Sequence, residues 1–105
     1  MRTAGCVLAL ACCLALAGCG PSTQELRTRG AIAYSNRDYP AAIAAFQAVL
    51  ERQPEDAESL CYLGHCHLAF AQKKLREGNQ LGALRELEDA IRYYDAAIHA
   101  SPGLM

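Results

Sequence analysis

The chain has 105 residues and a formal net charge of −1 at pH 7, which allows one small domain. This charge balance is neither strongly basic nor strongly acidic, and it argues against nucleic acid as a partner. Alanine is abundant, tryptophan is absent and β-branched residues are few. The composition therefore favours helices over strands.

The first 19 residues have the pattern of an export signal. Arg2 supplies a positive charge, and an uncharged apolar run from Val7 to Ala17 follows it. This run is shorter than the about 20 residues that a membrane-spanning helix needs. It also has no polar face, which argues against a buried core helix. We therefore expect residues 1–18 to be a signal peptide.

The apolar run ends in Leu16-Ala17-Gly18-Cys19, which resembles the lipobox of bacterial lipoproteins. The resemblance implies cleavage before Cys19 and lipidation of its thiol, with acyl chains such as palmitate that anchor residues 19–22 stably to a membrane. Gly20 stands where an aspartate would retain such a protein at the inner membrane in enterobacteria-like sorting. The resemblance thus implies the bacterial cell envelope, on the periplasmic face of the outer membrane if the cell has two membranes. An ordinary secretory signal is the alternative.

The first expected helix begins directly after this tether. Ser22 and Glu25 have the spacing of a capping box, in which each side chain bonds the backbone N–H of the other residue. We therefore expect a helix from about Thr23 to about Ser35. Residues 36–38 then form the turn into the second helix.

The second expected helix has a marked start and a marked end. Asp38 can cap it, Pro40 falls in its first turn, where a helix tolerates proline, and Pro54 ends it. Its large apolar residues recur at three- and four-residue spacing and so share one face. The residues of this face are Ile43, Phe46, Val49 and Leu50. Much of the pattern returns in residues 90–102.

These two helices resemble a tetratricopeptide repeat, a 34-residue helix–turn–helix unit. Gly30, Ala42, Phe46 and Pro54 have the spacing of that family. The resemblance implies that Gly30 and Ala42 let the helices touch and that Phe46 fills the space between them. The start of a second repeat follows at Leu60, Leu63 and Gly64. We expect Gly64, like Gly30, to lie at a tight contact between helices.

The register of the repeat then slips, because Arg76 stands where the pattern requires alanine. The simplest account is two extra turns in each helix of the second hairpin, since seven residues are close to two whole turns. We expect helices over residues 56–77 and 80–100, joined at residues 78–79. One stripe along the last helix comprises Leu84, Leu87, Ile91, Tyr94 and Ile98. The fold class is thus all-α, with two antiparallel hairpins over residues 23–102 and the second one lengthened.

In tetratricopeptide repeats, the first helix of each hairpin lines a concave groove that binds partners. Carried over, the resemblance implies a groove of Gln24, Arg27, Ala31, Tyr34 and Ser35 from the first hairpin, and of Glu58, Cys61, His65, Leu68 and Ala69 from the second. The lysine and asparagine of the family's carboxylate clamp are missing, which disfavours a C-terminal carboxylate as the ligand. An extended or helical peptide remains a candidate for this mixed polar and apolar groove.

The stretch from Cys61 to His67 reads CYLGHCH and is the one that invites a cofactor. Cys61 and Cys66 with the histidine that follows resemble a rare variant of the covalent haem site, and Cys61 and His65 could share a metal ion. We favour residues packed on a helix, because the repeat already explains Gly64. A disulfide between the two cysteines is not expected, since they lie about 140° apart around a regular helix.

No enzyme signature occurs in the sequence, such as a glycine-rich phosphate loop, G-x-S-x-G or H-E-x-x-H. We therefore expect no catalytic residue, no cofactor and no metal ion. The leading hypothesis is a lipid-anchored module or scaffold that binds protein partners at the cell envelope. The alternatives are a structural lipoprotein that acts through self-association and, less favoured, a haem or metal protein.

The end of the repeat pattern gives one further expectation. Repeat arrays normally finish with a capping helix, and the pattern stops at Pro102. We therefore expect the second hairpin to self-associate or to dock on a partner. The surface would include some of Leu75, Leu84, Leu87 and Tyr94.

Overall fold

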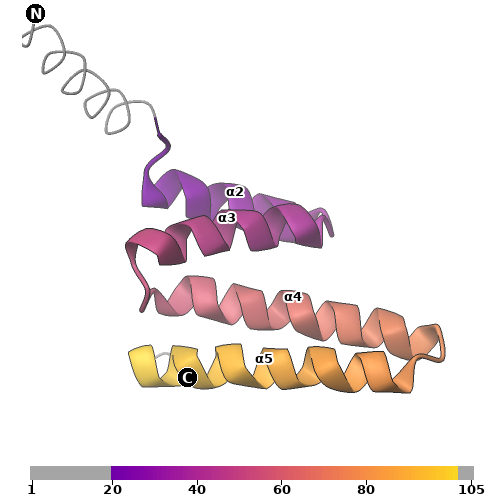
Figure 1. Cartoon of the computed structure of the whole chain (residues 1–105). Coiled ribbons are helices and arrows are strands. Elements are labelled where there is room, and N and C mark those ends of the chain that lie inside the picture. The colour runs from indigo at the N-terminus through magenta and orange to yellow at the C-terminus, as the bar shows by residue number, and fades with distance from the viewer. Residues whose placement is uncertain (1–19, 102–105) are drawn as a thin grey trace, which may run out of the picture.

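The computed structural model describes residues 20–101, which form four antiparallel α-helices stacked as two hairpins (Figure 1). The first hairpin consists of α2 (Thr23–Ser35) and α3 (Tyr39–Arg52), and the second of α4 (Ala57–Arg76) and α5 (Gln80–Ala100). The predicted all-α class is confirmed, and each helix begins and ends within a residue or two of its expected bounds. None of these helices combines the length and the apolar character that crossing a membrane requires.

Three of the predictions fall outside this part of the chain. The signal peptide of residues 1–18, the lipidated Cys19 and the last residue of the predicted repeat region, Pro102, all lie outside the described residues. The tether is described only from Gly20 to Ser22, and these predictions stay predictions.

Each helix begins at a side chain that accepts a hydrogen bond from a backbone N–H three residues later. These N-cap residues are Ser22, Asp38, Asp56 and Asn79. At α2 the predicted capping box is complete, with Glu25 N donating to Ser22 Oγ at 3.1 Å and Ser22 N donating to Glu25 Oε1 at 3.2 Å. Such caps satisfy N–H groups that have no partner inside the helix, and they fix where each helix starts.

The two hairpin turns are short and have positive φ angles. Arg37 lies in the α2–α3 turn with φ 64°, and Gly78 lies in the α4–α5 turn with φ 79°. Each turn closes with a backbone bond of 2.8 Å, from Asp38 N to Ala33 O and from Asn79 N to Lys74 O. Such short turns join consecutive helices as antiparallel hairpins.

The core lies between α2, α3 and α4 and is centred on Phe46, which is fully buried. The ring of Phe46 stacks on Tyr62 with 4.6 Å between centroids. A Cβ atom on Gly30 would lie 2.6 Å from the Phe46 ring, and one on Gly64 would lie 2.7 Å from the Tyr94 ring. The predicted tight contacts at both glycines are therefore confirmed.

The last helix packs through small residues. Ala83, Ala90 and Ala97, spaced by seven, are the buried residues of α5. The expected stripe of larger residues lies beside this face, so that Leu84, Ile91 and Ile98 are 57%, 64% and 40% exposed. Leu87 and Tyr94 are half-buried. Alanine lets α5 approach α4 closely, and the bulky residues are displaced to the edge of the contact.

The second hairpin is longer than the first, as predicted. Its helices have 20 and 21 residues, against 13 and 14 in the first hairpin. In Figure 1 the α4–α5 turn extends beyond the α2–α3 turn. Seven extra residues correspond to an overhang of about 10 Å. The molecule therefore has a step at this end, where α4 continues without cover from the first hairpin.

Candidate functional site

The predicted groove residues come from α2 and α4, which lie side by side. Arg27 and Tyr34 of α2 and Cys61, His65 and Leu68 of α4 are half-buried. At its two ends, Ser35 and Glu58 are exposed. Of the other members of the predicted set, Gln24 is exposed, and Ala31 and Ala69 are half-buried. The structure thus brings the two halves of the predicted groove together.

The centre of this groove is a cluster of aromatic rings around Tyr34. Its ring packs edge-on against Tyr39 and Tyr62 at centroid distances of 5.5 and 5.4 Å, and it lies 6.0 Å from the ring of His65. On the other side of His65, its Nδ1 atom and the Tyr94 hydroxyl are 2.6 Å apart. The cluster therefore links α2, α3, α4 and α5 and holds the groove rings in fixed orientations.

Burial changes the protonation of this cluster. Desolvation lowers the pKa of His65 below its ordinary value of 6.5, because burial disfavours the charged imidazolium. The same desolvation raises the pKa of Tyr34 and of Tyr94. All three side chains are therefore neutral at pH 7. Within the cluster, the groove offers rings and neutral hydrogen-bonding groups rather than charge.

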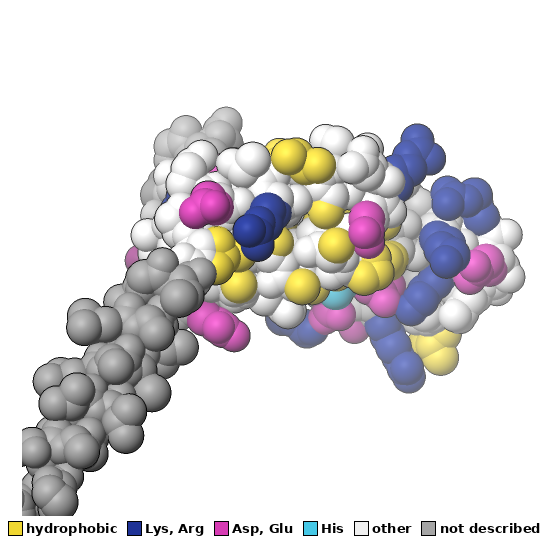
Figure 2. All heavy atoms as spheres, turned by 90° about the horizontal axis from the view of Figure 1, so that it is seen from above, with side chains coloured by type: hydrophobic (Ala, Val, Ile, Leu, Met, Phe, Trp, Pro, Cys, Tyr) yellow, Lys and Arg dark blue, Asp and Glu magenta, His cyan; other side chains and the backbone are white. Residues whose placement is uncertain are grey.

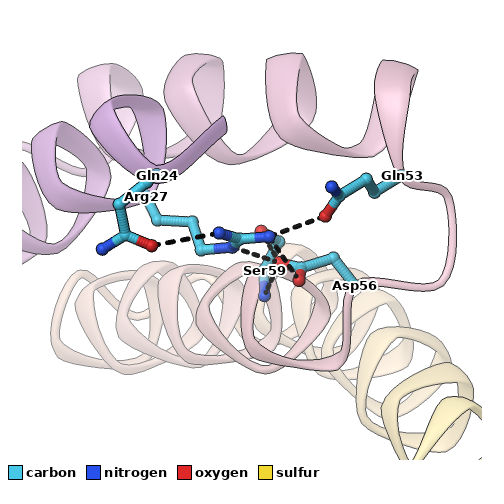
Figure 3. A network of polar contacts seen from close by, with 5 residues as sticks. All are labelled: Gln24, Arg27, Gln53, Asp56 and Ser59. Carbon is cyan, nitrogen blue, oxygen red and sulfur yellow. Dashed lines mark hydrogen bonds and ion pairs between the residues drawn. The ribbon is translucent and has the colours of Figure 1, made fainter. Parts of the chain in front are cut away.

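The guanidinium of Arg27, which the resemblance placed in the groove, is bound by other side chains of the protein (Figure 3). Its Nε and Nη2 atoms donate to the two carboxylate oxygens of Asp56, both at 3.1 Å. Further bonds run from Nη2 to Gln53 at 2.6 Å and from Nη1 to Gln24 at 3.2 Å. Asp56 also accepts from the Ser59 backbone N–H at 3.1 Å and from its hydroxyl at 2.5 Å. The guanidinium is therefore used to fasten α2 to the corner between α3 and α4.

The Arg27–Asp56 pair shifts both titrations in the direction that favours the charged forms. Partial burial raises the pKa of Asp56, but the hydrogen bonds from Arg27 and Ser59 outweigh it, and the pKa falls below its ordinary 3.8. The hydrogen bond to Asp56 likewise raises the pKa of Arg27. Both groups are therefore charged at neutral pH.

A comparison with known families agrees with this geometry. Residues 27–73 match the family model of the tetratricopeptide repeat. The match begins in α2 and ends in α4, and it contains the whole of α3 with Phe46. The resemblance expected from the sequence is thereby supported over these residues, and the all-helical arrangement of the described hairpins is consistent with a tetratricopeptide-repeat type of fold. Comparisons with curated proteins and with solved structures found no significant match.

The repeat resemblance accounts for the predicted groove residues but not for a second polar cluster between α4 and α5. His67 Nδ1 and Glu86 Oε1 are 2.8 Å apart, and Lys74 Nζ donates to Glu86 Oε2 at 2.8 Å. Asp89 lies 4.0 Å from His67 and pairs with Arg92. Partial burial raises the pKa of Glu86, but the bonds from His67 and Lys74 outweigh it and lower the pKa overall.

The ligand atoms of His67, Glu86 and Asp89 lie within 4.8 Å of one another, close enough to hold a metal ion. Each carboxylate already has a cationic partner, Lys74 or Arg92. These pairs neutralise the negative charge that would attract a cation. The cluster is accounted for as a network of ion pairs that joins the two long helices.

The cysteine-rich stretch lies within α4, which continues without a break through both cysteines. Cys66 is fully buried in the core, and burial raises the pKa of its thiol to about 11. Cys61 is half-buried, and desolvation raises its pKa as well. Both cysteines are free. Cys66 would have to leave the core before any haem could attach to it.

Proposed function

We propose that this protein is a lipid-anchored interaction module of the bacterial cell envelope, which binds a partner protein along the surface of α2 and α4. Tetratricopeptide repeats generally act by binding proteins and are typically not enzymes. The observation that carries the proposal is the aromatic cluster around Tyr34, held edge-on by Tyr39 and Tyr62 and beside His65. Aromatic side chains that are ordered before binding are the usual anchors of protein interfaces.

The composition of the groove defines the class of partner. Tyr34, His65 and Leu68 offer half-buried apolar surface with neutral polar atoms. Ser35 and Glu58 are exposed at its ends. Arg27 is engaged with Asp56 and supplies no free charge. This surface suits a peptide segment with an apolar or aromatic side chain at its centre and polar groups at its ends.

The anchor proposal rests on the Leu-Ala-Gly-Cys motif that ends at Cys19. Three residues, Gly20 to Ser22, separate this cysteine from α2, and three residues span at most about 10 Å. Arg52 Nη1 donates to Pro21 O at 2.6 Å and so ties the tether to the end of α3. A lipid on Cys19 would hold the corner between α3 and α4 close to the membrane and direct the α2–α3 turn away from it.

Lipidation is tested by metabolic labelling with a fatty acid. The wild-type chain should incorporate the label and be processed before Cys19, and Cys19→Ala should abolish both. Equal labelling of the two chains would refute the anchor and leave the groove proposal untouched.

The groove is tested by placing a photo-crosslinking amino acid at Tyr34 in the full chain, in cells. The matched control position is Arg29, which is exposed and lies about 140° away around α2. An adduct with a distinct protein from Tyr34, and none from Arg29, is the expected result. Adducts of equal yield from both positions would contradict a groove-specific partner.

Self-association is a second candidate function, and the outer face of α5 favours it. The α3 residues Ile43 and Leu50 are partly buried against a core that includes Leu63 of α4. Ile91 and Ile98 each come directly after a buried alanine of α5. In α3, Ile43 and Leu50 likewise come directly after the buried residues Ala42 and Val49. Ile91 and Ile98 are nevertheless exposed. In α3 this face packs on the next helix, α4. The corresponding face of α5 is not covered by any of the described helices.

Sedimentation of residues 20–105 across a concentration series tests this second candidate. A dimer that Ile91→Lys converts to monomer, while Arg92→Lys at the neighbouring position does not, would support self-association. A monomer at every concentration would exclude it for this segment.

A further inference from the structure

The step at the end of α4 contains a pocket that adjoins the predicted groove, with Tyr39 and Ala69 at their border, and opens beside the α2–α3 turn. Its volume is about 560 Å³, within the range of about 300–1,000 Å³ that is usual for ligand sites. The α2–α3 turn and the start of α3 form one wall, and the last two turns of α4 form the other. The pocket exists because α4 continues past the first hairpin.

Three cations from two separate elements line this pocket. Arg37 comes from the α2–α3 turn, and Lys73 and Arg76 come from the last turn of α4. All three are exposed, and no ion pair joins any of them to a carboxylate in residues 20–101. Figure 2 shows Lys and Arg side chains gathered at this end of the molecule.

No carboxylate is among the residues that line the pocket. In the sequence, Asp38 directly follows Arg37, and Glu77 directly follows Arg76. The Asp38 side chain accepts a hydrogen bond from Ala41 N as the cap of α3, and Glu77 ends α4 outside the pocket. The positive charge of the pocket is therefore left for a ligand.

Two aromatic side chains, Tyr39 and Phe70, line the pocket together with the cations. The rings of Tyr39 and Phe70 meet edge-on, with 5.8 Å between centroids, and both residues are half-buried. Phe70 is also held edge-on by the ring of His67 at 6.0 Å. Half-buried aromatic rings beside unpaired cations distinguish this pocket from an ordinary solvated charged surface.

Lys73 and Arg76 have a simpler explanation, since cations in the last turn of a helix stabilise its dipole. That explanation does not extend to Arg37, which comes from another element. Arg37 also has φ 64°, a left-handed backbone conformation that residues with a Cβ atom rarely adopt. The turn thus keeps an arginine where a glycine or asparagine would be less strained.

We propose that this step pocket binds an acidic peptide segment of a partner protein. Carboxylates of the segment pair with Arg37, Lys73 and Arg76, and one aromatic or large apolar side chain packs on Tyr39 and Phe70. A long polyanion such as RNA fits less well, because the chain as a whole carries a net charge of −1 and gives no long-range attraction to it. The proposal does not depend on the groove or on lipidation.

The test is a titration of the full chain, solubilised in detergent, by fluorescence anisotropy. The probe is a labelled peptide, Glu-Asp-Phe-Glu-Asp, and the matched probe is Gln-Asn-Phe-Gln-Asn with the same label. The acidic peptide should bind at least 10-fold more tightly, and rising salt should weaken it. Equal binding of the two peptides, or tighter binding of an equally labelled oligonucleotide, would overturn the proposal.

Matched variants locate the binding. Arg37→Gln and Arg76→Gln should each weaken the acidic peptide by about 10-fold, which corresponds to one lost charge-assisted contact. Phe70→Leu keeps an apolar residue but removes the ring, and it should weaken both peptides. Arg85→Gln removes an exposed cation of α5 that does not line the pocket and should leave binding unchanged. An effect of Arg85→Gln as large as that of Arg37→Gln would show non-specific charge attraction and refute the pocket.

Discussion

Replacing Gly30 by alanine tests how the first hairpin is packed. A Cβ atom at this position would lie 2.6, 2.7 and 2.9 Å from three atoms of the Phe46 ring. Real Cβ atoms do not approach other atoms so closely, so either the ring or the helix must move. Phe46 is fully buried and stacked on Tyr62, which leaves the ring little freedom to shift. The added methyl group should therefore overpack the core.

Two effects of opposite sign set the size of the change. Forcing an extra carbon into a packed core costs about 1–3 kcal/mol. Alanine is also the better helix former, by about 1 kcal/mol over glycine in a helix interior. Because the Phe46 ring has little freedom to shift, we take the packing cost as about 2–3 kcal/mol. After the gain of about 1 kcal/mol in helix propensity, Gly30→Ala should lower the free energy of unfolding by about 1–2 kcal/mol. For a domain of this size that corresponds to a fall in melting temperature of roughly 4–16 °C.

The assay is thermal and urea unfolding followed by circular dichroism, with a double-mutant cycle as the control. Phe46→Leu opens space beside residue 30, so Gly30→Ala should cost less in that background or become stabilising. The reasoning is refuted if Gly30→Ala alone melts at or above the wild-type temperature. It is also refuted if the cost is the same with leucine at position 46.

Three more predictions concern the second hairpin and its corner. Gly64→Leu should lower the melting temperature because even a Cβ atom there meets the Tyr94 ring at 2.7 Å, and an unchanged value would contradict the contact. Asp56→Asn keeps the helix cap but loses the Arg27 ion pair, at about 0.5–1 kcal/mol at neutral pH. The pKa of Asp56 in the folded protein lies below its unfolded value of 3.8. Its contribution to the free energy of unfolding is therefore present above pH 3.8 and is lost as the pH falls through the folded pKa. Measured against pH, the free energy of unfolding should show this loss in the wild type and a smaller loss in Asp56→Asn. In native protein, iodoacetamide should modify Cys61 faster than Cys66, whose buried thiol has a pKa of about 11, and mass spectrometry showing the reverse order would contradict the burial.

The helices could be predicted because their ends carry local signals. Each of these signals affects only residues close to it in the sequence, so the helix ends could be located from the sequence alone. The signals are Ser22 with Glu25, Asp38 with Pro40, and Gly78. The glycine contacts were predictable for a different reason. Only the family resemblance indicated that residue 30 faces a helix.

The packed face of α5 could not be predicted from the apolar spacing within this helix, although the expected uncovered surface included Leu75 and Leu84, which are 53% and 57% exposed. Apolar residues cover more than one side of this helix, and larger side chains suggest the buried side. The structure buries Ala83 and Ala90 and leaves Leu84 and Ile91 exposed. The choice depends on how closely α4 approaches, which no residue within α5 specifies.

The polar contacts between distant parts of the chain could not be predicted from the sequence either. Arg27 and Asp56 are 29 residues apart, and His67 and Glu86 are 19 apart. Pairs so far apart in the sequence leave no periodic pattern from which the contact could be predicted. The resemblance placed Arg27 in the groove but could not show that its guanidinium is already bound. The groove positions of Tyr34 and His65 followed from the resemblance, and their shared ring contacts needed the three-dimensional structure.

The order of contacts along the chain has a consequence for folding. Each described helix packs mainly on its neighbours in sequence, α2 on α3, α3 on α4 and α4 on α5, with a smaller contact between α2 and α4. Proteins dominated by such local contacts fold quickly, because little chain entropy is lost before each contact forms.

A chain built in this way can also fold in the order in which it emerges. The pair of α2 and α3 can place Phe46 against Gly30 as soon as both helices form. The next helix, α4, completes this core with Tyr62 and Leu63 and provides the surface for α5. No core of the described helices needs a segment that is distant in the sequence. Such a chain can be delivered N-terminus first and still spend little time with its apolar surface exposed.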